Sequence, residues 1–195
     1  MPFLSDRIAV EEIDDIRWRL LEPVSYEGKE QVFTVPTGFT TDFASVPRFL
    51  TWLVPTYGRY TKAAILHDWL WKLADAGDFD RADADGIFRR AMRELDVAFL
   101  RRWLMWAAVR LAGVRKSGLS TLWRPGFGQL AALVAVTLPG FLFVLVPGCV
   151  VLAALFVFYL AESIAFLILK IGSRRAPTGK PVKKVNPPSF RWTPS

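Results

Sequence analysis

The sequence predicts an α+β fold: a small β-hairpin or sheet, then a three-helix core, then a C-terminal transmembrane helical hairpin. Three observations predict it. β-rich segments precede residue 36, three stretches between residues 59 and 112 carry apolar side chains at helical spacing, and residues 130–169 contain one charged side chain, Glu162. A chain of 195 residues that is 52% hydrophobic has room for one domain and a membrane segment.

Charge is divided unevenly along the chain. Residues 1–100 hold 12 Lys/Arg and 17 Asp/Glu, a net charge of −5, whereas residues 101–195 hold 13 Lys/Arg and one acid, a net charge of +12. Basic residues that flank an apolar stretch are typical of membrane proteins. We therefore expect membrane lipid as a partner and do not expect nucleic acid. The single cysteine, Cys149, excludes an intramolecular disulfide.

The first part of the soluble domain reads as β structure. Residues 16–21 and 31–35 are β-rich, and Glu27-Gly28-Lys29 lies between them, which predicts a β-hairpin. Residues 36–48 predict a loop.

Helices follow this loop. Ser45 is expected to cap a short helix over residues 46–53, with Pro47 in its first turn. Three longer helices are predicted over residues 59–75, 81–95 and 98–112. Gly77 is expected to end the first of them, and Asp80 is expected to cap the second.

The predicted domain organisation has four parts: a soluble α+β domain (1–115), a linker (116–128), a membrane hairpin (129–171) and a basic disordered tail (172–195). Forty apolar residues are about twice the length of one membrane span. Pro147-Gly148 is the expected turn between spans over 129–146 and 149–171. A re-entrant hairpin that does not reach the far side of the bilayer is the alternative.

Basic residues on both sides of the apolar stretch predict an even number of spans. Both termini are then cytoplasmic. The N-terminal residues also lack the pattern of a cleaved signal peptide. We therefore expect a membrane protein whose soluble domain lies in the cytoplasm.

His67 is the only histidine, and its neighbours at helical spacing are apolar, so it is expected on the core side of its helix. Asp85 shares an apolar face with Phe88 and Met92. A buried carboxylate needs a partner, and the candidates are His67 and an arginine such as Arg48 or Arg110. An aspartate that holds one imidazole nitrogen frees the other to take a proton from water.

The predicted helix lengths leave the His67–Asp85 bond open. In a tight antiparallel pair of helices the two residues are offset by ~7 Å at 1.5 Å per residue. Asp42, in the preceding loop, is a second candidate partner for His67. A histidine satisfied within the core, without any chemistry, is the competing interpretation.

Four ordered motifs carry a resemblance to a known family. They are Gly-Phe-Thr-Thr-Asp-Phe-Ala-Ser-Val-Pro at 38–47, Ala-Ile-Leu-His-Asp-Trp-Leu-Trp at 64–71, Arg-x-x-Ala-Asp-x-x-Phe at 81–88, and Ala-Val-Arg with a following glycine at 108–113. Residues 5–115 resemble the phage- and prophage-associated family called domain of unknown function 1353. The resemblance implies a phage or prophage context and phage structural proteins as partners, but no activity. The family pattern usually has tyrosine where this chain has Trp71.

The His-Asp doublet, with a distant aspartate on a neighbouring helix, is also weakly similar to the helix pair of secreted phospholipases A2. That similarity implies His67 as the base, Asp68 as a calcium ligand and Asp85 as the residue that orients His67. Asp42, Asp68 and Asp85 offer the oxygen ligands that Ca²⁺ or Mg²⁺ prefers. The glycine-rich calcium loop of these enzymes is absent here.

Two functions follow as alternatives. The first is a membrane-anchored hydrolase that uses a dyad of His67 and an aspartate, Asp85 or Asp42, on a lipid or envelope substrate. The second is a non-enzymatic phage protein for assembly, lysis or DNA delivery, in which the same side chains form a structural network. The binding or structural residues expected in either case are Ser45, Arg48, Trp71 and Arg110. A third idea is a holin-like action of the apolar segment, motivated by Glu162.

Overall fold

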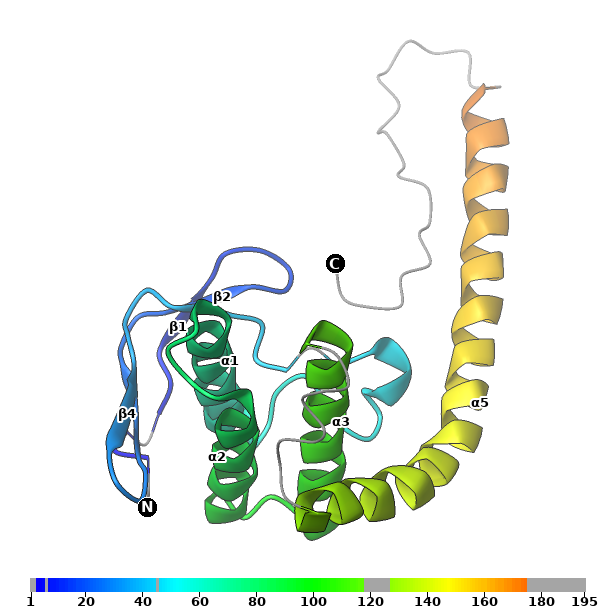
Figure 1. Cartoon of the computed structure of the whole chain (residues 1–195). Helices are drawn as coiled ribbons and strands as arrows, with labels where there is room; N and C mark the ends of the chain where they lie inside the picture. The colour runs from blue at the N-terminus through cyan, green and yellow to red at the C-terminus, as the bar shows by residue number, and fades with distance from the viewer. Residues whose placement is uncertain (1–2, 6, 45, 118–126, 175–195) are drawn as a thin grey trace.

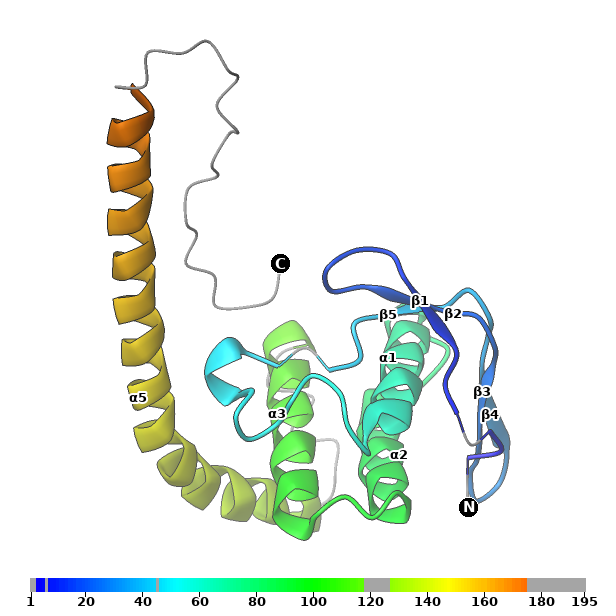
Figure 2. The same ribbon diagram turned by 180° about the vertical axis from the view of Figure 1, so that it is seen from behind.

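The computed structural model describes residues 3–5, 7–44, 46–117 and 127–174. In these residues two small sheets come first, three helices follow, and one long apolar helix ends the described chain (Figures 1 and 2). The predicted α+β class with a three-helix core is therefore confirmed. The predicted membrane hairpin is wrong.

Short strands form two antiparallel sheets. One sheet has the order β1-β2-β5, made by β1 (Val10–Glu12), β2 (Trp18–Leu20) and β5 (Thr40–Thr41). The other is a hairpin of β3 (Val24–Glu27) and β4 (Val32–Val35).

The predicted hairpin had the right turn and the right second strand but the wrong first strand. The Gly28 N–H donates to the Gln31 carbonyl at 2.9 Å, and this tight turn joins the strands directly before and after it. Residues 18–20 pair with β1 and β5 instead. The strand β5 also lies within the segment predicted as loop.

The three helices of the core are α1 (Thr61–Ala76), α2 (Arg81–Glu94) and α3 (Phe99–Ser117). Gly77, with a left-handed φ of 90°, ends α1. The Asp80 carboxylate accepts from the backbone N–H groups of Ala82 and Asp83, at 2.6 and 3.3 Å, and so caps α2. Both predicted helix boundaries are confirmed.

The helix predicted over residues 46–53 is shorter than expected. It is the single 3₁₀ turn η1 (Arg48–Leu50), in which the Leu50 N–H donates to the Pro47 carbonyl at 2.8 Å. The predicted cap, Ser45, lies outside the described residues.

The central position in the helical core belongs to α2, which contacts both α1 and α3. The two sheets cover α1 on the side away from α3 (Figures 1 and 2). Apolar side chains from the strands and helices form one buried cluster, which includes Leu20, Val24, Tyr26, Val35, Ile65, Leu66, Leu70 and Met92. Any polar side chain on the inner face of α2 is therefore enclosed on both sides.

The apolar segment is one continuous helix, α5 (Phe127–Arg174), with Pro139 and Pro147 inside it. The expected turn at Pro147-Gly148 is not formed. A proline removes one helical hydrogen bond, which permits a bend as well as a break. Figures 1 and 2 show that α5 bends in its first half and is straight beyond.

The first half of α5 packs on the α+β domain formed by the sheets and the three helices. Leu133 is buried against Trp106 and Ala107 of α3. Gly148 lies against Phe49, whose Cδ2 would be 3.4 Å from a Cβ at that position. None of the described α5 residues after Gly148 is buried. The two halves of this helix therefore differ in environment, although they are one secondary-structure element.

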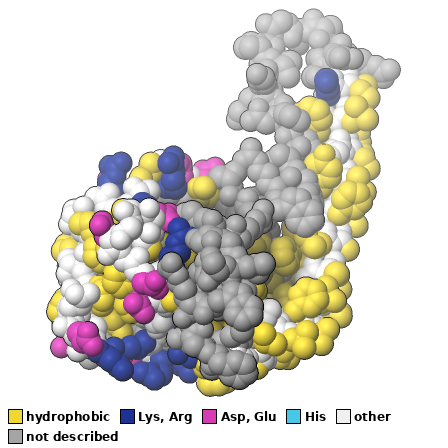
Figure 3. All heavy atoms as spheres, viewed as in Figure 1, with side chains coloured by type: hydrophobic (Ala, Val, Ile, Leu, Met, Phe, Trp, Pro, Cys, Tyr) yellow, Lys and Arg dark blue, Asp and Glu magenta, His cyan; other side chains and the backbone are white. Residues whose placement is uncertain are grey.

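By length and composition, one helix in the described part of the chain could cross a membrane, over Ala131–Ile171. In the view of Figure 3, hydrophobic side chains run along α5, whereas most of the charged side chains that are coloured lie on the α+β domain. The predicted linker begins within α3, which continues to Ser117. The rest of that linker up to residue 126, and the tail from residue 175, lie outside the described residues.

Candidate functional site

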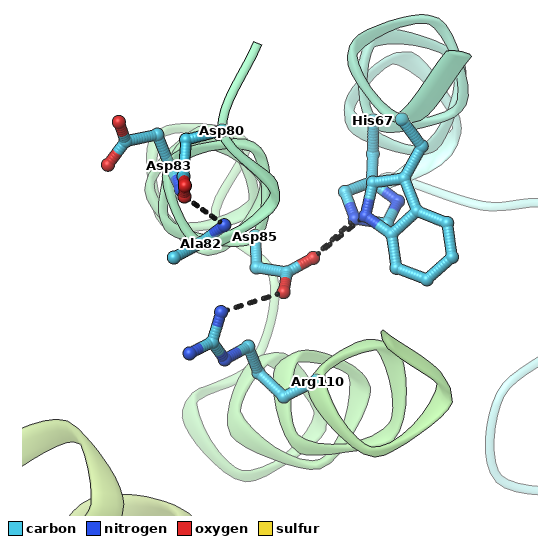
Figure 4. A network of polar contacts seen from close by, with 7 residues as sticks. His67, Asp80, Ala82, Asp83, Asp85 and Arg110 are labelled. Atoms are coloured by element: carbon cyan, nitrogen blue, oxygen red, sulfur yellow. Dashed lines mark hydrogen bonds and ion pairs between the residues drawn. The ribbon is translucent and has the colours of Figure 1, made fainter. Parts of the chain in front are cut away.

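The centre of the site is the Asp85 carboxylate on α2, which is 2% exposed. Its Oδ1 lies 2.8 Å from His67 Nε2 and accepts a hydrogen bond from the Trp71 indole N–H at 3.0 Å. Its Oδ2 accepts from the Arg110 guanidinium at 3.2 Å. Figure 4 shows Asp85 between His67 and Arg110. One buried acid therefore connects three helices.

Sequence spacing explains why these groups meet. His67 and Trp71 are four residues apart on α1, so their side chains lie on the same face, one turn apart. Asp85 faces them because it shares the apolar stripe of α2 with Phe88. Arg110 comes from α3, the other neighbour of α2, and is buried. The carboxylate thus has donors from both adjacent helices.

Donor and acceptor chemistry fixes the hydrogen on the His67 ring. An ionised carboxylate only accepts, so the Nε2 atom of His67 must carry the hydrogen and donate it to Asp85. In the neutral ring, Nδ1 then has the free lone pair. This is the arrangement in which an imidazole can take a proton from water.

Aromatic rings surround the imidazole. The Phe88 ring lies 4.6 Å from it and the Trp71 ring 5.2 Å, measured between ring centroids. His67 is 5% exposed. The ring is therefore held in one orientation by packing on its faces and by Asp85 at its edge.

Asp68, next to His67 on α1, has a different environment. Its Oδ2 accepts a hydrogen bond from the Thr41 hydroxyl at 2.6 Å. Burial raises the pKa of Asp68 to about 7 from its ordinary value of 3.8, Thr41 and Lys72 act to lower it, and the charge of Asp42 raises it. The carboxyl of Asp68 therefore changes protonation state near neutral pH.

The backbone is constrained directly after Thr41, the last residue of β5. Phe43 has a left-handed φ of 64°, which is uncommon for a bulky side chain. Its backbone N–H donates to the Thr41 hydroxyl at 3.0 Å, and its ring stacks on Trp18 at 5.8 Å between centroids. Such backbone outliers cluster at functional sites. The Thr41 hydroxyl, which accepts from Phe43 and donates to Asp68, links the end of β5 to α1.

The site adjoins a cavity of about 630 Å³ that is lined by His67 and Asp68 of α1, by the loop before α1, by α3 and by α5. His67 is therefore not enclosed by hydrocarbon on all sides. The residue that bonds Asp85 thus also borders a space that a small molecule can enter.

Most predicted site residues come together in the structure. His67, Asp85, Trp71 and Arg110 form one network, and Arg110 is one of the two arginines expected to neutralise Asp85. The bond partner of His67 is Asp85, and Asp42 lies instead where its charge acts on Asp68. The Arg48 side chain and Ser45 lie outside the described residues.

Sequence reasoning missed Thr41 and the stacking role of Phe88. Thr41 lies within the 38–47 motif, directly before Asp42. Nothing in that position predicts its hydrogen bond to Asp68. Trp71, whose position is usually tyrosine in the resembled family, donates its indole N–H to Asp85.

The described residues give no support for the calcium site predicted at Asp68. Among the described residues, no group of three or more His, Cys, Asp or Glu side chains is placed to hold a metal ion. Asp68 and Asp85 bond different partners, Thr41 for the first and three nitrogen donors for the second.

Comparison with known proteins gives one result. The sequence model of the family described as Protein of unknown function (DUF1353) matches residues 18–109. No curated protein and no solved structure matches the chain. The phage context and the similarity to phospholipases A2 stay predictions.

The Asp85–Arg110 pair provides a stability test. In Asp85→Asn, the buried Arg110 charge has no carboxylate, and we expect the free energy of unfolding to fall by about 3–5 kcal/mol. Replacing both residues, as Asp85→Asn with Arg110→Met, should recover part of that loss because no charge then remains buried. Denaturant unfolding of the full chain in micelles measures both. Asp14→Asn, which removes an exposed pair with Arg17, is the control and should change little. A single mutant as stable as wild type would contradict the pairing.

Asp68 provides a pH test. Its folded pKa lies above its unfolded value, so the native state binds more protons between about pH 4 and pH 7. The stabilising contribution is complete below the unfolded pKa and is lost as pH rises through 7, with a slope approaching about 1.4 kcal/mol per pH unit. In Asp68→Asn this slope should disappear, and in Asp78→Asn, an exposed acid, it should remain. Equal slopes in wild type and Asp68→Asn would contradict the shifted pKa.

Proposed function

We propose that this chain, whose residues 18–109 belong to the DUF1353 family of no assigned activity, is a membrane-anchored hydrolase. His67 is its general base and Asp85 orients it. The substrate is an ester or amide of membrane lipid or of the cell envelope. The observation that carries the proposal is His67, whose imidazole is bonded to a buried carboxylate and which also lines a cavity.

The proposed reaction is general-base hydrolysis. The free Nδ1 of His67 takes a proton from a water molecule, the water oxygen attacks the substrate carbonyl, and the carbonyl π electrons move to oxygen. When the tetrahedral intermediate collapses, the C–O or C–N bond breaks and the imidazolium returns its proton to the leaving group. Asp85 stabilises the imidazolium through the Nε2–H bond. The products are a carboxylic acid and an alcohol or amine.

The anchor in this proposal is the second half of α5. Residues 149–171 extend about 34 Å at 1.5 Å per residue, close to the roughly 30 Å of a bilayer's hydrocarbon core. Large side chains there are exposed, such as Phe158 at 64% and Ile168 at 64%. An apolar surface of this extent is typical of a lipid contact.

Orientation in the membrane is open to measurement. One continuous helix that crosses once places its two ends on opposite faces, so the expectation of two cytoplasmic termini loses its basis in paired spans. The cytoplasmic location of the soluble domain stays a prediction, as do the phage context and any membrane action of Glu162.

A second function has its own support. Asp85 already has donors from α1 and α3 and a neutralising arginine, which is what a purely structural cross-link between helices requires. A non-enzymatic phage protein for assembly, lysis or DNA delivery would use the network in this way, and His67 would then be a satisfied core histidine.

The anchor proposal predicts different behaviour for two chains. The full chain should stay in the membrane pellet after alkaline carbonate extraction, whereas a chain that ends at residue 148 should be released, since it lacks the proposed span. Protease digestion of sealed vesicles, with tags at each end, gives the orientation. Release of the full chain by carbonate would contradict anchoring.

The hydrolase proposal predicts the effect of His67→Gln. The glutamine amide still donates to Asp85 but offers no base, so we expect hydrolysis to fall by roughly 10²–10⁴-fold with little loss of stability. The measurement is hydrolysis of a fluorogenic phospholipid, a short-chain nitrophenyl ester and an acyl amide by the full chain in lipid nanodiscs. Tyr57→Phe, at a residue that is 71% exposed, is the control. A wild-type protein inactive on all three probes would leave the structural function.

A further inference from the structure

The cavity beside His67 is lined almost entirely by apolar side chains. It is lined by residues of α1, α3, α5 and the segment 43–54. Among the described lining residues, the only side chains with oxygen or nitrogen that reach it are His67, Asp68, Thr137 and Trp71, and all others are apolar. Its volume of about 630 Å³ falls in the usual range of roughly 300–1,000 Å³ for small-molecule sites. A strongly polar ligand would lose its hydration there without enough partners.

One wall of the cavity is also the proposed anchor. Cys149 and Leu152 line the cavity from the second half of α5. Their neighbour Val150 is 64% exposed. The surface that would contact lipid thus continues into the cavity along a single helix.

An unsatisfied hydroxyl marks the α5 wall. Thr137 Oγ1 is buried and has no hydrogen-bond partner among the described residues. Buried hydroxyls are nearly always bonded. Thr137 lines the cavity, and a change of its χ1 rotamer would present the hydroxyl to a carbonyl oxygen of a ligand there.

From these observations we infer that the cavity binds one acyl chain of a membrane lipid, with the ester carbonyl at Thr137. The chain enters beside α5 and lies between α3 and the segment 43–54. Each buried methylene strengthens such binding by about fourfold, from ~0.8 kcal/mol per CH₂. The inference goes beyond the proposed hydrolysis, because an acyl chain binds here whether or not His67 acts as a base.

Photochemical crosslinking tests it directly. The full chain is placed in phosphatidylcholine nanodiscs that contain a phosphatidylcholine with a diazirine in the middle of one acyl chain. After irradiation, mass spectrometry maps the modified residues. We expect adducts on α3 and on residues 49–54. Adducts confined to the outer face of α5 would overturn the inference.

Three variants sharpen the test. Ala108 lines the cavity and is solvent-accessible, so Ala108→Phe should fill the space and lower the α3 adducts by more than about tenfold, since displacing two methylenes costs about fourfold each. Ala112→Phe, at a second accessible lining position, serves if Ala108→Phe does not fold. Ala154→Phe, exposed on α5 but outside the lining, is the matched control and should leave the adducts unchanged.

Two further variants separate the possible causes. Thr137→Val keeps the shape but removes the hydroxyl, and should reduce adducts by about fivefold, the factor for one hydrogen bond of ~1 kcal/mol. His67→Gln should retain the adducts in full, even if hydrolysis is lost. If the wild-type chain shows adducts on α3 and residues 49–54 but no hydrolysis, the acyl-chain site stands and the proposed hydrolase does not. If it shows hydrolysis without those adducts, the acyl-chain site is overturned and the hydrolase is not.

Discussion

A carboxylate buried at the middle of a three-helix core must be compensated, and the arrangement of this domain follows from how Asp85 is compensated. An isolated ionised acid in that position would lower the free energy of unfolding by several kcal/mol. Its donors come from α1 and α3, so the acid restricts how both helices pack against α2. The same requirement orients the imidazole of His67. The structural function and the hydrolase function therefore both depend on the compensation of Asp85. They differ only in whether Nδ1 of His67 accepts a proton from water.

Much of this fold was predictable because local signals determine it. Gly77 and Asp80 set helix ends through backbone conformation and capping, and both act within four residues of the sequence. The pairing of β2 was not predictable in this way, because β5 lies about twenty residues further along the chain and only tertiary contact selects it. The continuity of α5 was missed for another reason. A proline in an apolar helix either breaks or bends it, and neighbouring contacts decide which.

The site shows the same division. Asp85 and Arg110 were identified because a charge on an apolar helical face requires a partner. The His67–Asp85 bond was not predictable, because ideal geometry gives an offset of ~7 Å in a tight antiparallel pair and only tertiary packing decides whether the helices cross obliquely enough to close it. The Thr41–Asp68 contact joins strand β5 to helix α1 across 27 positions. No periodicity connects those two elements, so the raised pKa of Asp68 had no signature in the sequence.

The bent helix α5 has a practical consequence for anyone who expresses the α+β domain alone. Its first half covers apolar side chains of α3, including Trp106 and Ala107, and supplies most of the α5 residues that line the cavity. A fragment ending at Ser117 would present this uncovered face to water. Such a fragment would self-associate or require detergent even without a membrane span. The boundary of the folding unit therefore lies within the apolar helix, beyond the limit of the matched family region.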